Sequence, residues 1–383
     1  MVRAAAKNHA DVAVLTSPNQ YTSVLAAMAE SAGRVPADLR RRLALEAFQH
    51  TAAYDSAISR WMDGEVELES SPWLEAVPLR QTLRYGENPH QSATLHLPCG
   101  NLESIGLVQH GGKELSYNNI VDLVAAVKLV GDFQEPCCGI LKHTNPCGFG
   151  LGAGSMGLER ALRCDPVSAF GGVFAFNAAL DEEAAEVLAK RFLEIIVAPG
   201  YAEAALERLT RKKNVRVLTV DMEKFLGATR GKSRSWGSLT LTQSEDEGFP
   251  ELQQWNHVAG PEPDAETRTA LEMVWKVCKH GKSNAIVLGD LHATLGMGFG
   301  QMSRVDSTEL AVFKAANQDL DLKGCVAASD GFFPFPDGVE KLAEAGARAI
   351  IAPGGSIRDE EVAARAGELG VTLILTDRRH FNH

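Results

Sequence analysis

The stretch Cys138-Gly-Ile-Leu-Lys-His-Thr-Asn-Pro-Cys-Gly148 joins a short apolar run to a lysine, a histidine and a turn-forming sequence. The apolar run at 138–141 predicts a buried strand that stops at a loop, because Pro146 lacks a backbone donor for a strand ladder. In open α/β sheets, ligands bind outside the carboxyl ends of the strands. The pair Lys142-His143 is therefore a candidate cation and base at a strand end. A solvated lysine beside a hydrogen-bonded turn histidine is the alternative.

The composition is that of an ordinary globular protein, with 383 residues, 45% hydrophobic and 23% charged side chains. This length exceeds what one hydrophobic core usually supports, so it predicts two or three domains. The formal net charge of -11 argues against a general nucleic-acid-binding surface, but it allows a local basic pocket for a small anionic ligand. No apolar stretch approaches the roughly 18 residues of a membrane span, so we expect no membrane partner.

The seven cysteines are scattered, and none has Cys-x-x-Cys spacing. This pattern disfavours a disulfide framework and fits the reducing cytosol, so we expect a cytoplasmic protein. The zinc-deaminase signature, the Walker A motif and the Gly-x-Ser-x-Gly elbow are all absent from the sequence. Cys147 near His143 is an alternative nucleophile, although a buried structural role is commoner for such a cysteine.

Apolar periodicity divides the chain into a helical N-terminal part and two α/β parts. The N-terminal part has a strand-like run at 11–16, helical patterns at 19–32 and 36–61, and an acidic connector at 64–78. Strands and helices then alternate, which predicts a mostly parallel sheet with helices on both faces. We therefore predict a helical segment with connector at 1–78, a first α/β unit plus linker at 79–262, and a second α/β unit at 263–383.

Two strand-like segments indicate that the α/β units are duplicates. Glu194–Pro199 and Arg348–Pro353 each follow a helical pattern and end in Ala-Pro, although two short apolar strands can match by chance. Residues 221–263 interrupt the alternation between them. An alternating run at 238–243 predicts a hairpin within this linker.

Other polar or glycine-rich stretches could contribute to a binding site. Asn119 begins a predicted helix, so it is either a capping residue or a ligand-binding one. Gly296–Arg304 suits close backbone approach to a ligand but matches no dinucleotide fingerprint well. Ser329–Asp337 holds three phenylalanines between aspartates, which could sandwich a heteroaromatic ring or pack in the core. The tail would normally fray; if it docks, Arg379 could bind a phosphate.

Several of these stretches occur together in one known family. In order, the chain contains Leu83-Arg-Tyr-Gly-Glu-Asn-Pro-His-Gln91, Lys113-Glu-Leu-Ser-Tyr-Asn-Asn119, Leu141-Lys-His-Thr-Asn-Pro-Cys-Gly148, Cys164-Asp-Pro-Val-Ser-Ala-Phe-Gly-Gly172, Lys282-Ser-Asn-Ala-Ile-Val287, Gly300-Gln-Met-Ser-Arg-Val305 and Ala352-Pro-Gly-Gly-Ser356. With these motifs, Arg80 to His383 resembles the AICAR transformylase domain of the bifunctional purine-biosynthesis protein. Arg3–His9 resembles the end of its IMP cyclohydrolase domain, so we expect nearly all of that domain to be absent.

The resemblance implies a fold of two linked, cytidine-deaminase-like α/β/α units without zinc, here with a helical N-terminal appendage. It implies transfer of a formyl group from the co-substrate 10-formyltetrahydrofolate to the 5-amino group of AICAR, with no metal required. It also implies a homodimer with sites between subunits. Cyclohydrolase activity is not expected, and a separate cyclohydrolase chain is a candidate partner. The alternative function is a non-catalytic, purine-nucleotide-binding subunit that assembles with such a chain.

For this reaction the resemblance implies three catalytic residues: His143 as general base, Lys142 as electrostatic partner, and Asn284 orienting the formyl group or His143. An imidazole suits the role because its ordinary pKa is about 6.5. Phe299 stands where we expect alanine, and its larger side chain would narrow the folate side of the binding site. The implied phosphate ligands are Arg84, Tyr85 and Arg379, and the other residues of the nucleotide and folate sites are Asn119, Phe170, Gly171, Glu194, Arg304, Phe332, Phe335, Asp337 and Phe381.

Overall fold

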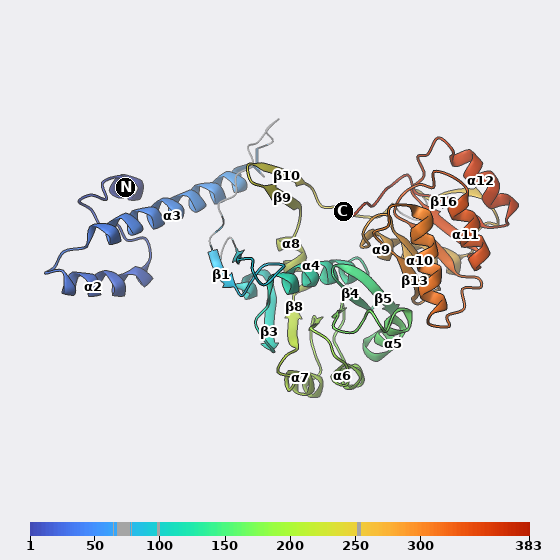
Figure 1. Ribbon diagram of the computed structural model, residues 1–383, viewed down its shortest axis with the longest axis horizontal. Coiled ribbons are helices and arrows are strands. Elements are labelled where there is room, and N and C mark those ends of the chain that lie inside the picture. The colour runs from blue at the N-terminus through green and yellow to red at the C-terminus, as the bar shows by residue number, and fades with distance from the viewer. Residues whose placement is uncertain (64, 67–76, 78, 98–99, 251–253) are drawn as a thin grey trace. The chain divides into compact units, whose positions relative to one another are not determined.

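The structure is a computed structural model that describes residues 1–63, 65–66, 77, 79–97, 100–250 and 254–383 (Figure 1). Its chain forms two compact units, Met1–Ser104 and Ile105–His383. Most of the predicted connector at 64–78 lies outside the described residues. The domain boundaries predicted at residues 78 and 262 stay predictions.

The unit Met1–Ser104 is mainly helical. The helical patterns predicted at 19–32 and 36–61 are confirmed as α2 and α3. The strand predicted at 11–16 is wrong, because Val14 packs in a small core with Ala6, Ala44 and Ala47 instead of joining a ladder. The elements are α1 (Val2–Lys7), η1 (Pro18–Gln20), α2 (Tyr21–Glu30), α3 (Ala37–Asp63) and the antiparallel strands β1 (Leu79–Leu83) and β2 (Ala93–His96).

The first half of the unit Ile105–His383 is a six-stranded sheet in the order β3-β8-β7-β6-β4-β5. Its α4 covers one face, and α5, α6 and α7 cover the other. The short helix η2 (Leu102–Ile105) spans the boundary between the two units. The elements that follow it are β3 (Leu107–Gly111), α4 (Tyr117–Gly131), β4 (Cys137–Lys142), β5 (Asn145–Leu151), α5 (Gly154–Cys164), β6 (Val173–Phe176), α6 (Glu182–Ala189), β7 (Ile195–Ala198), α7 (Glu203–Thr210), β8 (Arg216–Val220) and α8 (Met222–Ala228).

The second half repeats this architecture, with strand order β11-β16-β15-β14-β12-β13. The hairpin predicted in the linker is confirmed as the antiparallel pair β9 and β10. The elements are β9 (Lys232–Trp236), β10 (Leu239–Gln243), β11 (Asn256–Ala259), α9 (Ala265–Lys279), β12 (Ile286–Gly289), β13 (Thr294–Gly298), α10 (Arg304–Ala316), β14 (Val326–Ser329), α11 (Asp337–Ala345), β15 (Ala349–Ala352), α12 (Asp359–Glu368) and β16 (Thr372–Leu375).

The predicted duplication of α/β units is confirmed, because the two sheets share strand order and strand directions. The echoing segments Glu194–Pro199 and Arg348–Pro353 supply β7 and β15, which hold the same place in their sheets. The prediction of mostly parallel sheets is wrong. Only the β6-β7-β8 and β14-β15-β16 neighbours are parallel, since β4 and β12 each turn back through a hairpin.

The core of each half lies between its sheet and its helices. In the first half, Ile140 of β4 is fully buried against Leu158 of α5 and Leu188 of α6. Burying a side chain of this size is worth about 1.5–3 kcal/mol. On the opposite face, a Cβ at Gly139 would lie 2.9 Å from Leu129 of α4, so this helix packs directly on the strand. Both faces of β4 are therefore covered.

Membrane-spanning helices, metal-ligand clusters and disulfides are absent from the described residues. No described helix is long and apolar enough to cross a membrane. No group of three His, Cys, Asp or Glu side chains in this part of the chain is placed to hold a metal ion. The cysteines it includes are buried and free of disulfides, and Cys99 lies outside it.

Candidate active site

The chain reverses direction at His143-Thr144, directly after β4. Lys142 pairs with Asn145 across the hairpin, and the two turn residues have φ of +51° and +64°. Two-residue hairpin loops with positive φ at both positions normally carry Asn-Gly. A β-branched residue in this conformation is an outlier, and each such residue costs about 1–3 kcal/mol. Strain of this kind clusters at functional sites, so the turn is a strong local sign of one.

The loop predicted at Asn145–Gly148 is wrong, because these residues begin β5. Proline is tolerated at edge strands and at bulges, and β5 is the edge of its sheet. The register of the β4–β5 pair also shifts between Ile140 and Leu141, where Pro146 pairs. The strand predicted at 138–141 is confirmed as part of β4.

The first turns of α4 support the His143-Thr144 turn. Oδ1 of Asp122 accepts a hydrogen bond from the Thr144 N–H at 2.8 Å. Burial raises the pKa of the Asp122 carboxyl, and Glu194 adds to this, whereas the Thr144 bond and His143 oppose it. The sequence motifs do not single out Asp122. Its one signal is a place one helical turn after Asn119, on the same face of the helix.

Asn119 both caps α4 and contacts a second predicted site residue. It exchanges hydrogen bonds with Ser116, donating its N–H to Oγ at 3.3 Å and accepting the Ser116 N–H at 3.1 Å. Its Nδ2 also donates to Oε2 of Glu194 at 2.7 Å. Asn119 can therefore cap α4 and also contact another predicted site residue.

Lys142 is half-buried and held by the backbone. Its Nζ donates to the carbonyl oxygen of Phe170 at 2.6 Å. The Phe170 ring stacks on Phe192 with 4.7 Å between ring centroids. Gly171 has φ of +72°, and a Cβ there would lie 3.3 Å from Phe192 and 4.0 Å from Nζ of Lys142. The structure thus brings Lys142, Phe170 and Gly171 together.

These residues gather at one edge of the first sheet. The edge is the carboxyl end of β4, as predicted, but it is the amino end of β6 and β7, which run antiparallel to β4. The amino end of α4 lies at the same edge, since Asp122 bonds to the turn after β4. The rule that places ligands at carboxyl ends of strands therefore holds for β4 alone among these strands.

A cavity of about 280 Å³ opens beside the turn, between the duplicated halves. The edge strands β5 and β13 lie side by side here (Figure 1), where the Leu151 N–H donates to the His292 carbonyl at 2.8 Å. The Lys282 N–H donates to Oδ1 of Asn145 at 3.0 Å. The lining residues are Lys142, His143, Asn145, Pro146, Cys147, Cys164, Asp165, Ser168, Met297, Phe299, Leu310 and Lys314.

Cys147 lines this cavity but is a poor nucleophile. Burial raises the pKa of its thiol far above the ordinary value, and the nearby Cys164 and Asp165 add to this. Its Sγ lies 3.5 Å from the carbonyl oxygen of Ile140, which fits a buried thiol donor. Since the thiolate is the reactive form, the alternative of a cysteine nucleophile loses its chemical basis.

The remaining catalytic candidate, Asn284, lies just before β12. Its Nδ2 donates to the Gln301 carbonyl at 2.9 Å, and its own carbonyl accepts from Ser307 Oγ at 2.9 Å. Lys282 precedes it in the same loop, and burial lowers the pKa of its ammonium, with the Arg234 charge lowering it further. The loop thus anchors the Asn284 amide, but Asn284 is not among the residues that line the cavity.

Arg304 is tied into the Ser329–Asp337 stretch. Its guanidinium donates to Asp330 Oδ1 at 2.7 Å, to Ser329 Oγ at 2.7 Å and to the Phe332 carbonyl at 3.1 Å. The Asp330 side chain is fully buried, so its ion pair with Arg304 is desolvated. Arg304 and Phe332 are therefore brought together in one hydrogen-bonded network.

The C-terminal tail docks on the second half. His380 is 1% exposed and contacts Asp246 at 2.8 Å, and the Ser283 N–H donates to the Asn382 carbonyl at 3.1 Å. The ring of Phe381 would lie 2.8 Å from a Cβ at Gly331. The Arg379 guanidinium stands 4.3 Å from the centroid of the Phe381 ring. Phosphate binding by Arg379 stays a prediction.

The other predicted site residues have more local contacts. Phe335 lies under the guanidinium of Arg358, 4.6 Å from its ring centroid, and Asp337 accepts the N–H of Gly338 at the start of α11. Arg84 and Tyr85 belong to the unit Met1–Ser104. There the Arg84 guanidinium donates to the Tyr85 hydroxyl at 2.9 Å.

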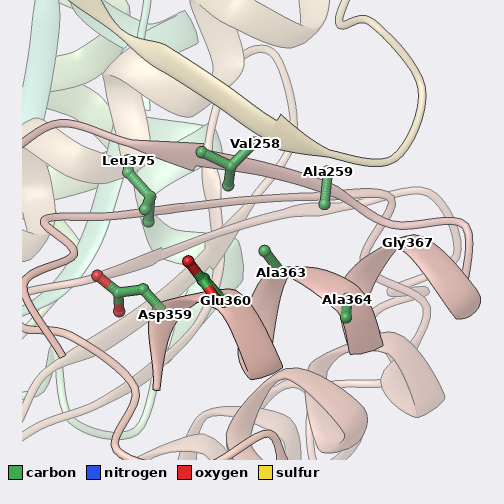
Figure 2. A pocket seen from close by; sticks show the side chains of 8 residues that line it. All are labelled: Val258, Ala259, Asp359, Glu360, Ala363, Ala364, Gly367 and Leu375. Atoms are coloured by element: carbon green, nitrogen blue, oxygen red, sulfur yellow. The ribbon is translucent and has the colours of Figure 1, made fainter. Parts of the chain in front are cut away.

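A larger hollow of about 530 Å³ lies between α12 and the strands β11 and β16 (Figure 2). Small side chains of α12, Ala363 and Ala364, leave this space open, and Gly367 extends it. Of its two carboxylates, Asp359 and Glu360, the first accepts the Gly355 N–H at 2.6 Å. Cations and an imidazole are found instead in the smaller cavity, so we place the site there.

Phe299 of the second half lines the smaller cavity. The position of its ring requires a glycine at residue 281. A Cβ at Gly281 would lie 2.1 Å from the Phe299 ring. We expect Gly281→Ala to lower the free energy of unfolding by about 1–3 kcal/mol, because the ring must shift. Adding Phe299→Ala should relieve the clash, so the double variant should be more stable than the two single effects predict. Denaturant unfolding measures this; simple additivity would contradict it.

Comparison with known proteins identifies the family. The model of the AICARFT/IMPCHase bienzyme family matches residues 5–314. Proteins named bifunctional purine biosynthesis protein PurH are 52% identical in Parasynechococcus marenigrum (strain WH8102), 48% in Synechococcus sp. (strain CC9902) and 44% in Desulfitobacterium hafniense (strain DSM 10664 / DCB-2). Each alignment covers 100% of this chain and 75% of the relative. The chain belongs to the AICARFT/IMPCHase bienzyme family.

Proposed function

We propose that this chain transfers a formyl group from 10-formyltetrahydrofolate to the 5-amino group of AICAR, giving formyl-AICAR. As a family member with relatives at 44–52% identity over its whole length, it is a formyltransferase of purine biosynthesis. The observation that carries the assignment to a site is the Lys142-His143 pair at the cavity between the duplicated halves. Lys142 is bonded to the Phe170 carbonyl, and the next turn residue, Thr144, is bonded to Asp122 of α4.

The reaction needs a base because the aromatic amine is a weak nucleophile. In our proposal the amine nitrogen attacks the formyl carbon while His143 takes its proton. Lys142 stabilises the oxygen that becomes negative, and Asn284 orients the formyl group. The bond from the formyl carbon to the folate nitrogen then breaks, and that nitrogen receives a proton.

Other parts of the proposal concern binding and assembly. Arg84, Tyr85 and Arg379 hold the nucleotide phosphate, and Phe299 narrows the folate side of the cavity. The chain works as a cytoplasmic homodimer with sites between subunits, and its transformylase units begin at residues 79 and 263. The remaining ligand-lining residues are Asn119, Phe170, Gly171, Glu194, Arg304, Phe332, Phe335, Asp337 and Phe381.

The test is turnover by the purified chain. With AICAR and 10-formyltetrahydrofolate we expect formyl-AICAR and tetrahydrofolate in equal amounts. Chromatography and absorbance would measure the two products. Saturable AICAR binding without turnover would favour the non-catalytic subunit instead. Supplied with formyl-AICAR, the chain should form no IMP, because the motifs behind the proposal belong to the formyl-transfer part of the family. IMP formation would contradict that expectation.

A further inference from the structure

A lysine of the second half reaches a carboxylate of the first half in the cavity. Nζ of Lys314, on α10, lies 2.6 Å from Oδ2 of Asp165, which follows α5. The same ammonium donates to Oγ of Ser168 at 3.3 Å. The Lys314 side chain is 36% exposed and that of Asp165 only 10%, so water screens the pair partly. None of the roles proposed above involves these residues.

Asp165 organises the loop that follows it. It accepts the Ser168 N–H at 2.9 Å on Oδ1 and the Ser168 hydroxyl at 2.7 Å on Oδ2. Burial alone would raise its pKa, but the Lys314 and Ser168 hydrogen bonds hold the pKa of this carboxyl below its ordinary value. Asp165 is therefore charged at neutral pH and ties α10 to the 165–171 loop.

The same loop holds Lys142. The Ala169 N–H donates to the Asp165 carbonyl at 3.1 Å, and the Gly171 N–H to the Phe192 carbonyl at 2.9 Å. Between these two anchored residues, the Phe170 carbonyl accepts one of the three Lys142 ammonium protons at 2.6 Å. A continuous set of polar contacts thus runs from Lys314 through Asp165 and the loop to Lys142.

Charge balance gives the pair a second effect. Lys142 and Lys314 line the same cavity, and two ammonium groups there repel each other. Asp165 compensates the Lys314 charge, since their contact distance is 2.6 Å. The Lys142 charge is then left to act on a ligand.

We propose that Lys314 is a positioning residue for the formyl transfer. Paired with Asp165, it fixes the 165–171 loop, so that the Phe170 carbonyl aims the Lys142 ammonium at the reacting oxygen. This proposal rests on the proposed function. It assigns Lys314 no contact with substrate.

A double-mutant cycle between Lys314→Met and Lys142→Met tests the proposal. Alone, Lys314→Met should lower kcat about tenfold, with KM for AICAR changed less than about threefold, because an interaction made through Lys142 matters in the transition state. In the Lys142→Met background it should cost less than about twofold, since residues acting through one group are not additive. Lys314→Arg keeps the charge and should recover most of the loss.

The matched control is Lys279→Met. Lys279 also joins the two halves, at 2.9 Å from Asp132, but its pair does not touch the 165–171 loop. It should leave kcat within about twofold of wild type, because a change with no shared partner does not act through Lys142. Thermal unfolding of each variant checks that the fold is intact.

Two results would overturn the proposal: an equal loss from Lys314→Met with and without Lys142, or an equal loss from Lys279→Met. Either would make the pair a general structural link. A wild-type chain without turnover would instead refute the proposed function, so the two failures are distinguishable.

Discussion

Replacing His143 by asparagine should lower kcat at least about 100-fold while AICAR still binds. The loss follows from the role of general base, which contributes about 10²–10⁴ to a rate. Asparagine is the informative replacement because residue 143 has φ of +51° in a two-residue hairpin turn, a place that favours asparagine. The variant should therefore keep the turn, or strengthen it, while losing the imidazole.

Stability and activity should move apart in this variant. We expect its melting temperature to equal or exceed that of wild type, whereas turnover falls. Single-turnover kinetics with AICAR and 10-formyltetrahydrofolate would place the loss in the chemical step, and calorimetry would measure AICAR binding. His143→Ala serves as the comparison without an amide. Near-normal turnover in either variant would remove His143 from the role of base.

The strands could be predicted from the sequence because each half buries its sheet on both faces. Short apolar runs such as Cys138–Leu141 and Ala349–Ala352 have few alternatives to a fully covered strand. Strand direction was harder to predict. The turn at His143-Thr144 lacks the glycine or asparagine that marks a hairpin, so the reversal after β4 has no local signal.

The site was predictable only where its residues are consecutive or share a motif. Lys142, His143 and Phe170 stand in quoted motifs, and the structure places the first two at the cavity and bonds the third to Lys142. The contact of Lys314 with Asp165 joins residues 149 positions apart, and helix periodicity explains a lysine on α10 equally well as a solvated one. Such a pairing depends on how the two halves meet, which no local pattern encodes.

Replacing Lys142 by methionine should cost about 100-fold in kcat, or about 2.7 kcal/mol of transition-state stabilisation. Methionine retains the apolar stem of this half-buried side chain, so the end of β4 should keep its packing. It removes the ammonium that the Phe170 carbonyl holds at 2.6 Å. Steady-state kinetics should show the loss in kcat, with the AICAR dissociation constant changed only a few-fold.

Lys142→Arg separates charge from geometry. A guanidinium keeps the charge but is larger and planar, so it cannot occupy the ammonium position 2.6 Å from the Phe170 carbonyl, and we expect little recovery. Combining Lys142→Met with His143→Asn should cost far less than the product of the single losses, because both groups serve one transition state. If Lys142→Met instead weakens AICAR binding and leaves kcat intact, Lys142 contributes only to binding of the ground state, and the catalytic pair reduces to His143 alone.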